Sequence, residues 1–228
     1  MKPIKRITVL LAEDHGIVRE GLRGLLEAHD DIEVVGESAT GRQAVEMTRK
    51  LNPAVIVMDI AMPRLNGLEA ARQIRQTVPA VKVLILSAHN DDTYVEKAME
   101  MGVAGYLIKQ TSADFLAKAI REVEKGNTYF SSAIVKKCSH YDQQASKRKQ
   151  PPKTKIASLS PREMEVLQLI AEGEANKQIA AELGVSIKTV EKHRDHLMHK
   201  LDIHDTASLT RYAISAGVIE NSVQLTVG

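Results

Sequence analysis

Four short apolar runs of the sequence each end in a polar side chain that could take part in chemistry. Glu13 and Asp14 follow residues 7–12, Asp59 follows residues 54–58, Ser87 follows residues 81–86 and Lys109 follows residues 104–108. Carboxylates held close together repel one another, and a hard divalent cation with oxygen ligands, such as Mg²⁺, relieves that repulsion. A carboxylate can also attack a phosphoryl group and become an aspartyl phosphate, while an ammonium and a hydroxyl stabilise the transferred group. Taken one at a time, the same residues would equally suit a solvated acidic rim and a surface lysine.

The apolar runs themselves predict a sheet that would bring these residues together. They are nearly continuous and rich in Val, Ile and Leu, which is typical of strands buried on both faces, and they cover residues 7–12, 32–36, 54–58, 81–86 and 104–108. Apolar residues at helical spacing lie between them. Five strands alternating with five helices indicate an α/β fold with a five-stranded, parallel, doubly wound sheet. In such a sheet functional groups gather beyond the carboxyl ends of the strands.

The segments ITVLLAEDHGIVREGL, VIVMDIAMPRLNGLEA, VLILSAH and GYLIKQ together resemble the receiver domain of response regulators, over about residues 5–126. The resemblance implies a flavodoxin-like fold in which Asp59 accepts phosphate from a sensor histidine kinase. It also implies that Mg²⁺ is bound by Glu13, Asp14, Asp59 and the backbone carbonyl of Ala61. Ser87 and Tyr106 resemble the two switch positions that move inward when phosphate arrives, Lys109 resembles the phosphate-binding lysine, and Gly67 matches a turn beside the nucleophile.

Two positions depart from the usual receiver pattern. The acidic pair is Glu13-Asp14 where two aspartates are more common, so the longer Glu13 is expected to bind the metal through water or in an adjusted position. Gln110 follows Lys109 where many receivers carry a proline, and a cis bond there is not assumed because a non-proline cis peptide costs about 2.5–4 kcal/mol.

The composition changes after the predicted sheet domain. The segment KKCSHYDQQASKRKQPPKTK is polar and basic and contains Pro151-Pro152, which predicts an exposed linker. We therefore expect a receiver domain at residues 6–126, a linker at 127–154 and a helical domain at 155–220. A basic arm that touches DNA phosphates is the open alternative for the linker.

The last 70 or so residues predict four helices that include a helix-turn-helix. Ser160 and Pro161 begin a helix over about 161–172, a short helix covers about 176–183, and Gly184 starts the turn. Ser186 caps a longer helix to Leu201, and a last helix covers about 205–216. Two helices joined by a short glycine-containing turn form a DNA-binding unit whose second helix enters the major groove. An ordinary amphipathic helix in a bundle is the alternative.

The second helix of this unit divides its residues between two faces. Its inner face is expected to hold Ile187, Val190, Leu197, Met198 and Leu201. The outer face carries Lys188, Glu191, Lys192, Arg194 and Asp195. Lys192 could donate to guanine, Glu191 or Asp195 could accept from cytosine, and His193 could donate to a phosphate.

The segments LSPREMEVLQLIAEG, NKQIAAELGVSIKTVEKHR and MHKL resemble the LuxR-type helix-turn-helix. A domain of this type behind a receiver is the NarL/FixJ arrangement. The resemblance implies DNA-facing residues at Lys188, Thr189, Lys192, His193 and Arg194. It also implies a dimerisation helix at the end of the domain, with Leu209, Tyr212 and Ala213. Packing of that helix against the first helix of the domain is the alternative, and both can hold together.

Charge and composition bound the remaining possibilities. Residues 1–135 hold 17 Lys and Arg against 18 Asp and Glu, whereas residues 136–228 hold 14 against 11, which weakly favours an anion-binding second half. With a single cysteine, Cys138, the chain can form no internal disulfide. No apolar run reaches the roughly 18 residues of a membrane span, and the N-terminus lacks the apolar core of a secretory signal. These features predict a cytoplasmic protein without a membrane partner.

The combined hypothesis is a transcription regulator that binds double-stranded DNA, is not an enzyme, and forms a homodimer promoted by phosphorylation. Three other readings stay open. The receiver could be a dimerisation module that needs no phosphate. Asp59 could serve a phosphatase or phosphotransferase, although Ala61 stands where some hydrolases carry a second aspartate. The chain could also be a LuxR-type sensor of a small molecule, which would need an apolar ligand pocket.

Overall fold

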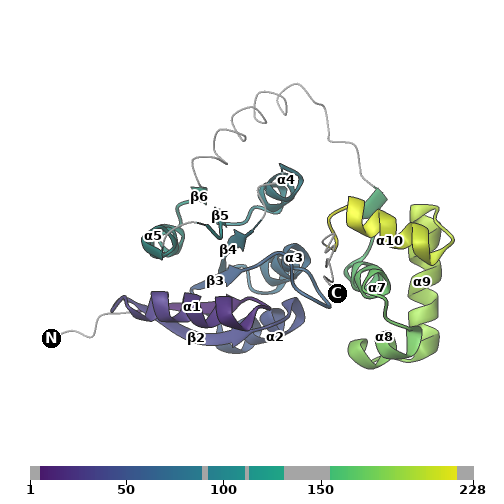
Figure 1. Cartoon of the computed structure of the whole chain (residues 1–228), viewed down its shortest axis with the longest axis horizontal. Coiled ribbons are helices and arrows are strands. Elements are labelled where there is room, and N and C mark those ends of the chain that lie inside the picture. Colours follow the sequence, from purple (N-terminus) through teal and green to yellow (C-terminus); the bar gives the residue numbers. More distant parts are fainter. Residues whose placement is uncertain (1–5, 89–91, 111–112, 131–154, 220–228) are drawn as a thin grey trace, which may run out of the picture. The chain divides into compact units, whose positions relative to one another are not determined.

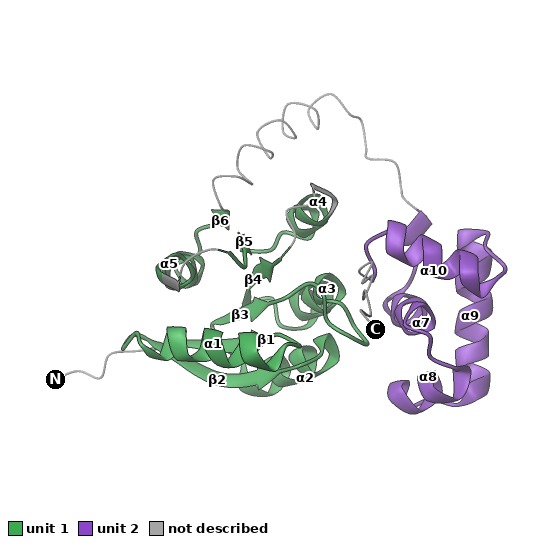
Figure 2. Ribbon diagram, viewed as in Figure 1, with its two compact units in different colours: residues 1–151 green, residues 152–228 purple. Residues whose placement is uncertain are grey.

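The computed structural model describes residues 6–88, 92–110, 113–130 and 155–219. The chain forms two compact units, residues 1–151 and residues 152–228 (Figure 2). Most of the predicted linker lies outside the described residues.

The first unit is a parallel sheet with helices on both faces (Figure 1). Its strands are β1 (Ile7–Ala12), β2 (Ile32–Ser38), β3 (Val55–Met58), β4 (Lys82–Ser87), β5 (Gly105–Ile108) and β6 (Tyr129–Phe130). They lie in the order β2-β1-β3-β4-β5-β6, and every neighbouring pair is parallel. The helices are α1 (Gly16–Glu27), α2 (Gly41–Leu51), α3 (Gly67–Thr77), α4 (Asp92–Glu100) and α5 (Ala113–Glu124). The predicted doubly wound α/β fold is confirmed.

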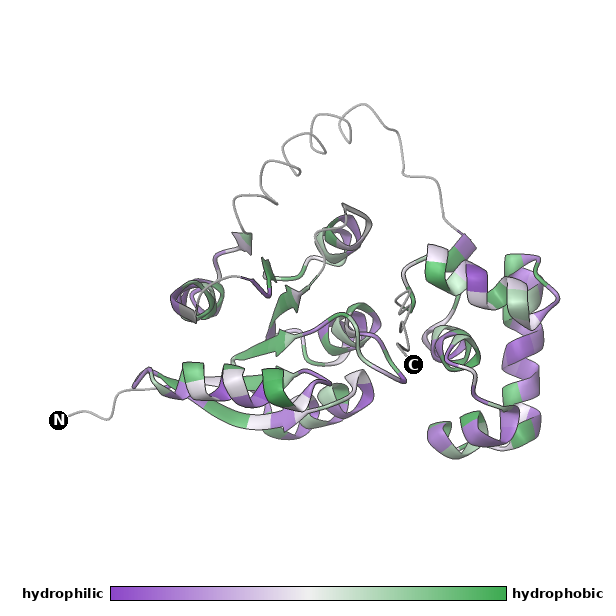
Figure 3. Cartoon of the chain, viewed as in Figure 1, coloured by the Kyte–Doolittle hydropathy of each residue, from purple (hydrophilic) through white to green (hydrophobic). Residues whose placement is uncertain are grey.

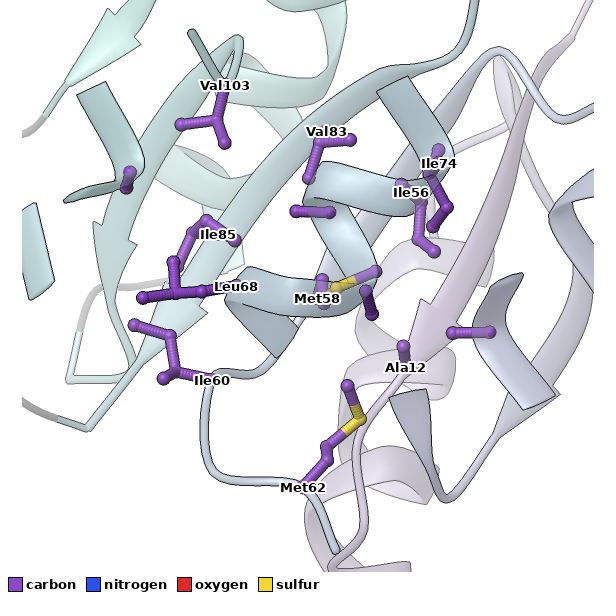
Figure 4. Packing of buried hydrophobic residues seen from close by; sticks show 14 of the residues in the cluster. Ala12, Ile56, Met58, Ile60, Met62, Leu68, Ile74, Val83, Ile85 and Val103 are labelled. Atoms are coloured by element: carbon purple, nitrogen blue, oxygen red, sulfur yellow. The ribbon is translucent and has the colours of Figure 1, made fainter. Parts of the chain in front are cut away.

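Two apolar layers hold this unit together, one on each face of the sheet. Alternate strand residues point to opposite faces, so Leu10 packs in one layer and Val9 in the other. One layer joins the sheet to α2, α3 and α4, and Figure 4 shows Leu68 and Ile74 of α3 packed over Ile56 and other strand residues. The other layer joins the sheet to α1 and α5. Burial on both faces explains why the strands read as continuous apolar runs.

The sheet has a sixth strand that the sequence analysis did not predict. Tyr129 and Phe130 pair with Gly105 and Tyr106, and the amide of Tyr129 donates to the carbonyl of Ala104 over 2.9 Å. The prediction of five strands was therefore wrong, and the sheet continues to Phe130, inside the range predicted as linker. A strand of two residues is too short to show any periodicity, and it exists only because β5 offers it a free edge.

The second unit consists of the short 3-10 helix η1 (Lys155–Ser158) and the helices α7 (Pro161–Ala171), α8 (Asn176–Leu183), α9 (Ile187–Leu201) and α10 (Thr206–Ser215). The four predicted helices are confirmed, with ends that differ by one residue or less. Ser160 and Glu163 form a capping box at the start of α7, and Ser186 and Asp205 cap α9 and α10. One apolar core joins all four helices, whereas hydrophilic residues cover most of α9 (Figure 3).

None of the helices in the described residues is both long enough and apolar enough to cross a membrane.

Candidate functional site

The parallel register brings the polar strand ends of the first unit to one edge of the sheet. Ala12 of β1 lies beside Met58 of β3, and Ser87 of β4 lies beside Ile108 of β5. Backbone hydrogen bonds continue one residue further, from the amide of Asp59 to the carbonyl of Ala12 over 2.9 Å. The strand ends therefore converge as predicted from their order.

Lys109 joins two of the predicted carboxylates directly. Its Nζ donates a hydrogen bond to Oδ2 of Asp59 over 2.9 Å and forms an ion pair with Oε2 of Glu13 over 2.7 Å. The other oxygen of Asp59 accepts from the backbone amide of Ile60 over 2.8 Å. Asp59 and Glu13 are buried, with exposed fractions of 3% and 1%, while the Lys109 side chain keeps 19% of its surface exposed. A buried carboxylate is thus oriented by an amide on one side and an ammonium on the other.

Burial and charge act in opposite directions at this cluster. Burial raises the pKa of Glu13, the contact with Lys109 lowers it, the charge of Asp59 raises it again, and the net shift is upward. Burial lowers the pKa of Lys109, but its contacts with Glu13 and Asp59 outweigh that effect and the pKa is raised. Lys109 therefore stays charged, and additional positive charge nearby would stabilise the ionised form of Glu13.

A third carboxylate and a histidine extend the cluster. Nδ1 of His15 lies 2.8 Å from Oδ1 of Asp14 and 3.3 Å from Oε1 of Glu13, and one ligand atom from each of the three lies within 4.8 Å of the others. The charge of Asp14 is the main cause of the raised pKa of His15. His15 was not among the residues predicted from the sequence, where its only signal was its place directly after the acidic pair.

The donor set fits Mg²⁺. Oε2 of Glu13 is buried and accepts no hydrogen bond from the described residues, although it forms the ion pair with Lys109. A buried carboxylate oxygen in this state is stabilised by a cation, and Mg²⁺ prefers oxygen ligands of this kind. Asp14 is more open, with 27% of its side chain exposed. Ala61 lies two residues beyond Asp59 and is partly exposed; metal binding by its carbonyl stays a prediction.

The loop between β3 and α3 packs directly on the backbone of Asp59. The amide of Gly67 donates to the carbonyl of Ile60 over 2.8 Å, and a Cβ atom at Gly67 would lie 1.8 Å from the carbonyl oxygen of Asp59. Only glycine permits this approach. The predicted position of Gly67 beside Asp59 is confirmed, although Gly67 is the first residue of α3 and not part of a turn.

The two predicted switch residues are both buried. Ser87 ends β4 and is fully buried. Tyr106 lies in β5 with no exposed surface, in the apolar layer that includes Val95 and Ala98 of α4. Tyr106 thus has the inward position in this structure; movement of either residue stays a prediction.

The predicted DNA-reading helix is α9, which follows α8 after a turn at Gly184 (φ 63°). Lys188, Glu191, Lys192 and Asp195 are exposed, while Thr189 and His193 are partly buried. Thr189 donates its amide to Oγ of Ser186 over 3.1 Å. Burial is the main cause of the lowered pKa of His193, followed by the charge of Arg162.

One assignment to the faces of α9 needs correction, and one predicted outer residue has partners within the unit. Ile187 was expected on the inner face but is 45% exposed, because it is the first residue of α9 and lies beyond the core. Arg194 was expected on the outer face; it is partly exposed, and its guanidinium donates to Oδ1 of Asn176 and to Oγ1 of Thr206.

The predicted dimerisation residues lie mainly in the core of their own unit. Leu209 and Ala213 have no exposed surface and pack in the apolar cluster with Val166 and Leu167 of α7. Packing within the unit therefore explains these two side chains, as the alternative predicted, and a role of α10 in dimerisation stays a prediction. Tyr212 is partly buried, and burial raises the pKa of its hydroxyl, an effect that the backbone of Ile156 opposes.

Comparison with known proteins gives two family matches that follow the two units. The model described as "Response regulator receiver domain" matches residues 9–121, and the model described as "Bacterial regulatory proteins, luxR family" matches residues 157–213.

Relatives match both units together. "Transcriptional regulatory protein MctR" of Rhizobium johnstonii is 38% identical over 214 residues, which cover 94% of this chain and 96% of MctR. "Response regulator protein VraR" of Staphylococcus aureus is 36% identical over 94% of this chain and 99% of VraR.

Similar solved structures also span both units. The crystal structure of response regulator ChrA from a haem-sensing two-component system is 31% identical, with a TM-score of 0.51, and covers 94% of this chain and 100% of that one. A structure of the response regulator RcsB in complex with DNA is 27% identical, with a TM-score of 0.57, and covers 92% and 98%.

Proposed function

This chain belongs to the response regulators that join a receiver domain to a LuxR-type DNA-binding domain, and from that premise we propose that phosphorylation of Asp59 controls its binding to DNA. The phosphodonor is a phosphohistidine of a sensor kinase, and the output is regulation of transcription. The observation that carries the proposal is the ammonium of Lys109 between the buried carboxylates of Asp59 and Glu13.

The residues of the first unit have separate roles in the transfer. A carboxylate oxygen of Asp59 attacks phosphorus, the phosphorus–nitrogen bond of the donor breaks, and the imidazole nitrogen leaves with the electron pair. The ammonium of Lys109, which already lies 2.9 Å from Asp59, then neutralises charge on the new phosphoryl group. Glu13, Asp14, Asp59 and the carbonyl of Ala61 would hold Mg²⁺, which supplies further charge neutralisation when bound.

The response then depends on two buried residues beside the site. The hydroxyl of Ser87 binds a phosphoryl oxygen, and Tyr106 holds the inward position that accompanies it. Phosphate shifts the equilibrium between two states only as far as it interacts differently with each. The favoured state forms a homodimer in which each α9 reads one half-site, with the half-sites one helical turn or a multiple apart.

In the second unit, α9 supplies the DNA contacts. Lys188 and Lys192 are exposed and suit phosphates and guanine, while Glu191 and Asp195 suit the amino group of cytosine. Thr189 and His193 lie at the edge of this face. Since both the kinase phosphohistidine and chromosomal DNA are partners, the cytoplasm is the compartment we propose. No turnover of a separate substrate is part of the proposal, only self-phosphorylation and slow loss of the phosphate.

The test is the intact mass of the chain after incubation with a small phosphodonor and Mg²⁺. Wild type should gain one phosphoryl group, and Asp59→Ala should gain none. If the wild type gained no mass, the alternative of a receiver that works without phosphate would be favoured. If both proteins gained the same mass, the modified residue would not be Asp59. Hydrolysis of a generic phosphate ester with many turnovers would instead favour an enzyme.

A further inference from the structure

Arg194 links the beginnings of two other helices to the middle of α9. Nη1 donates to Oδ1 of Asn176 over 3.2 Å, and Nη2 donates to Oγ1 of Thr206. Asn176 is the first residue of α8 and Thr206 is the first residue of α10. A single side chain thus ties three helices of the second unit together.

The environment of Arg194 differs from that of its basic neighbours on α9. Lys188 and Lys192 are exposed, whereas Arg194 is partly buried. A guanidinium offers five N–H groups in a rigid plane, so two contacts through different nitrogens define its orientation. Both acceptors are neutral oxygens, so the charge of Arg194 is not cancelled there. The competing role is a contact with a DNA phosphate through the remaining N–H groups.

Arg194 contacts the start of α8, which is the helix that leads into α9 through the turn. The turn between α8 and α9 depends on Gly184 (φ 63°), and the carbonyl of Leu183 at the end of α8 accepts from Nη2 of Arg162 over 2.7 Å. Arg162 thus holds one end of α8, and Arg194 holds the other. Recognition of base edges needs side chains placed within about 0.5 Å. Because α8 is held at both ends, it gives α9 a fixed support for such recognition.

Building on the proposed DNA binding, we propose that Arg194 is a positioning residue: it acts through Asn176 and Thr206 to hold α9 for DNA and does not itself contact a phosphate. The DNA-contacting set is then Lys188, Thr189, Glu191, Lys192, His193 and Asp195. Arg194 contributes to affinity through the orientation of these residues.

The decisive measurement is the affinity for a duplex selected by the wild type from a random-sequence pool, over a series of salt concentrations. Arg194→Ala should bind about tenfold more weakly with an unchanged slope of log K against log salt. A lost phosphate contact would reduce that slope by about 0.9. Lys192→Ala is the control that should show the reduced slope.

A double-mutant cycle tests the partner. Thr206→Val keeps the shape of the side chain and removes the acceptor, so it should weaken binding by about threefold. In the double variant, Thr206→Val should cause no loss of DNA affinity beyond that of Arg194→Ala, because the two residues act as one unit. A reduced slope for Arg194→Ala, or independent effects that add, would overturn the proposal, as would wild-type affinity of either variant.

Amide hydrogen exchange without DNA gives a readout that does not depend on the proposed function. Exchange in the first turns of α8 and α10 should accelerate in Arg194→Ala, and exchange in the first turn of α10 should accelerate in Thr206→Val. It should stay at the wild-type rate in Arg211→Ala, which removes an exposed arginine of α10. If wild type failed to bind any duplex, the proposed function would fail, and unchanged exchange would reject the role of Arg194 separately. If Arg194→Ala failed to fold, DNA affinity and amide exchange would both be measured on Thr206→Val.

Discussion

Nζ of Lys109 lies 2.7 Å from Oε2 of Glu13, and the same ammonium is hydrogen-bonded to Asp59 over 2.9 Å. Lys109 follows β5 and Glu13 follows β1, so the contact spans the centre of the sheet. It joins two buried carboxylates that would otherwise repel each other, and it places positive charge where a phosphoryl group would be received.

Loss of Lys109 should destabilise the receiver. Lys109→Met leaves two buried carboxylates with no ammonium between them, and we expect a loss of about 1–3 kcal/mol in the free energy of unfolding. Urea denaturation measures it. Lys125→Met is the matched control, because Lys125 is 60% exposed and pairs with Glu122 at the surface, and it should change stability by about 0.5 kcal/mol or less. Equal losses in both variants would contradict the role given to Lys109.

Gly67 should not tolerate a side chain. In Gly67→Ala the new Cβ would meet the carbonyl oxygen of Asp59 at 1.8 Å, so the backbone of one of them must shift. We expect a loss of about 2 kcal/mol or more together with slower phosphorylation by a small phosphodonor. Gly21→Ala in α1 has nothing within 4 Å and should stabilise the helix by about 0.5–1 kcal/mol. Normal phosphorylation of Gly67→Ala would show that the loop does not shape the site.

Removal of Mg²⁺ should lower the thermal stability of the receiver. A cation that binds only the folded chain stabilises it by mass action, so the melting temperature should rise when Mg²⁺ is added after treatment with a chelator. Asp14→Asn should lose most of this rise, because Asp14 is the most open carboxylate of the cluster. Asp30→Asn, a change at an exposed residue, should keep it. A rise of the same size in all three proteins would exclude the cluster as the binding site.

The second unit should lose stability in acid through Glu163. Burial raises the pKa of this carboxyl, but Lys200 and Ser160 outweigh it and the pKa is lowered. A carboxyl with a depressed pKa in the folded state contributes stability above its unfolded pKa of about 4.3, and this is lost as the pH falls through the lower folded value.

Glu163→Gln isolates that charge, since glutamine can still complete the capping box. The variant should be less stable by about 1 kcal/mol at neutral pH, and the difference should vanish in acid, as followed by urea denaturation at several pH values. Glu174→Gln is the control and should follow the wild type throughout. A difference that persists below the folded pKa would assign the effect to packing and not to charge.

Two variants should distinguish the control of DNA binding by phosphate from the contact with DNA itself. Lys192→Ala should bind the selected duplex more weakly in both the phosphorylated and unphosphorylated states, because an exposed cation on α9 is lost. Asp59→Ala should lose only the difference between those states, as measured by fluorescence anisotropy. Lys118→Ala, an exposed change on α5, should behave as wild type. An unchanged response of Asp59→Ala to the phosphodonor would contradict the proposed switch.

The local sequence pattern was sufficient to predict most of the helices and strands. Strands buried on both faces leave continuous apolar runs, and helix ends are set by capping residues such as Ser160 and Asp205 within a single turn. Both signals lie within a few neighbouring residues, so they can be read without the fold. The order of the strands then placed Asp59, Glu13 and Lys109 at one edge, because parallel strands end on the same side.

Contacts between distant segments were decided only by the tertiary structure. The strand at Tyr129 exists through pairing with β5. Leu209 is apolar, which suits a dimer surface and a core equally well; only the packing of α10 on α7 puts it inside. Residue type states what a side chain can do, whereas its partner depends on which segments the folded chain places beside it.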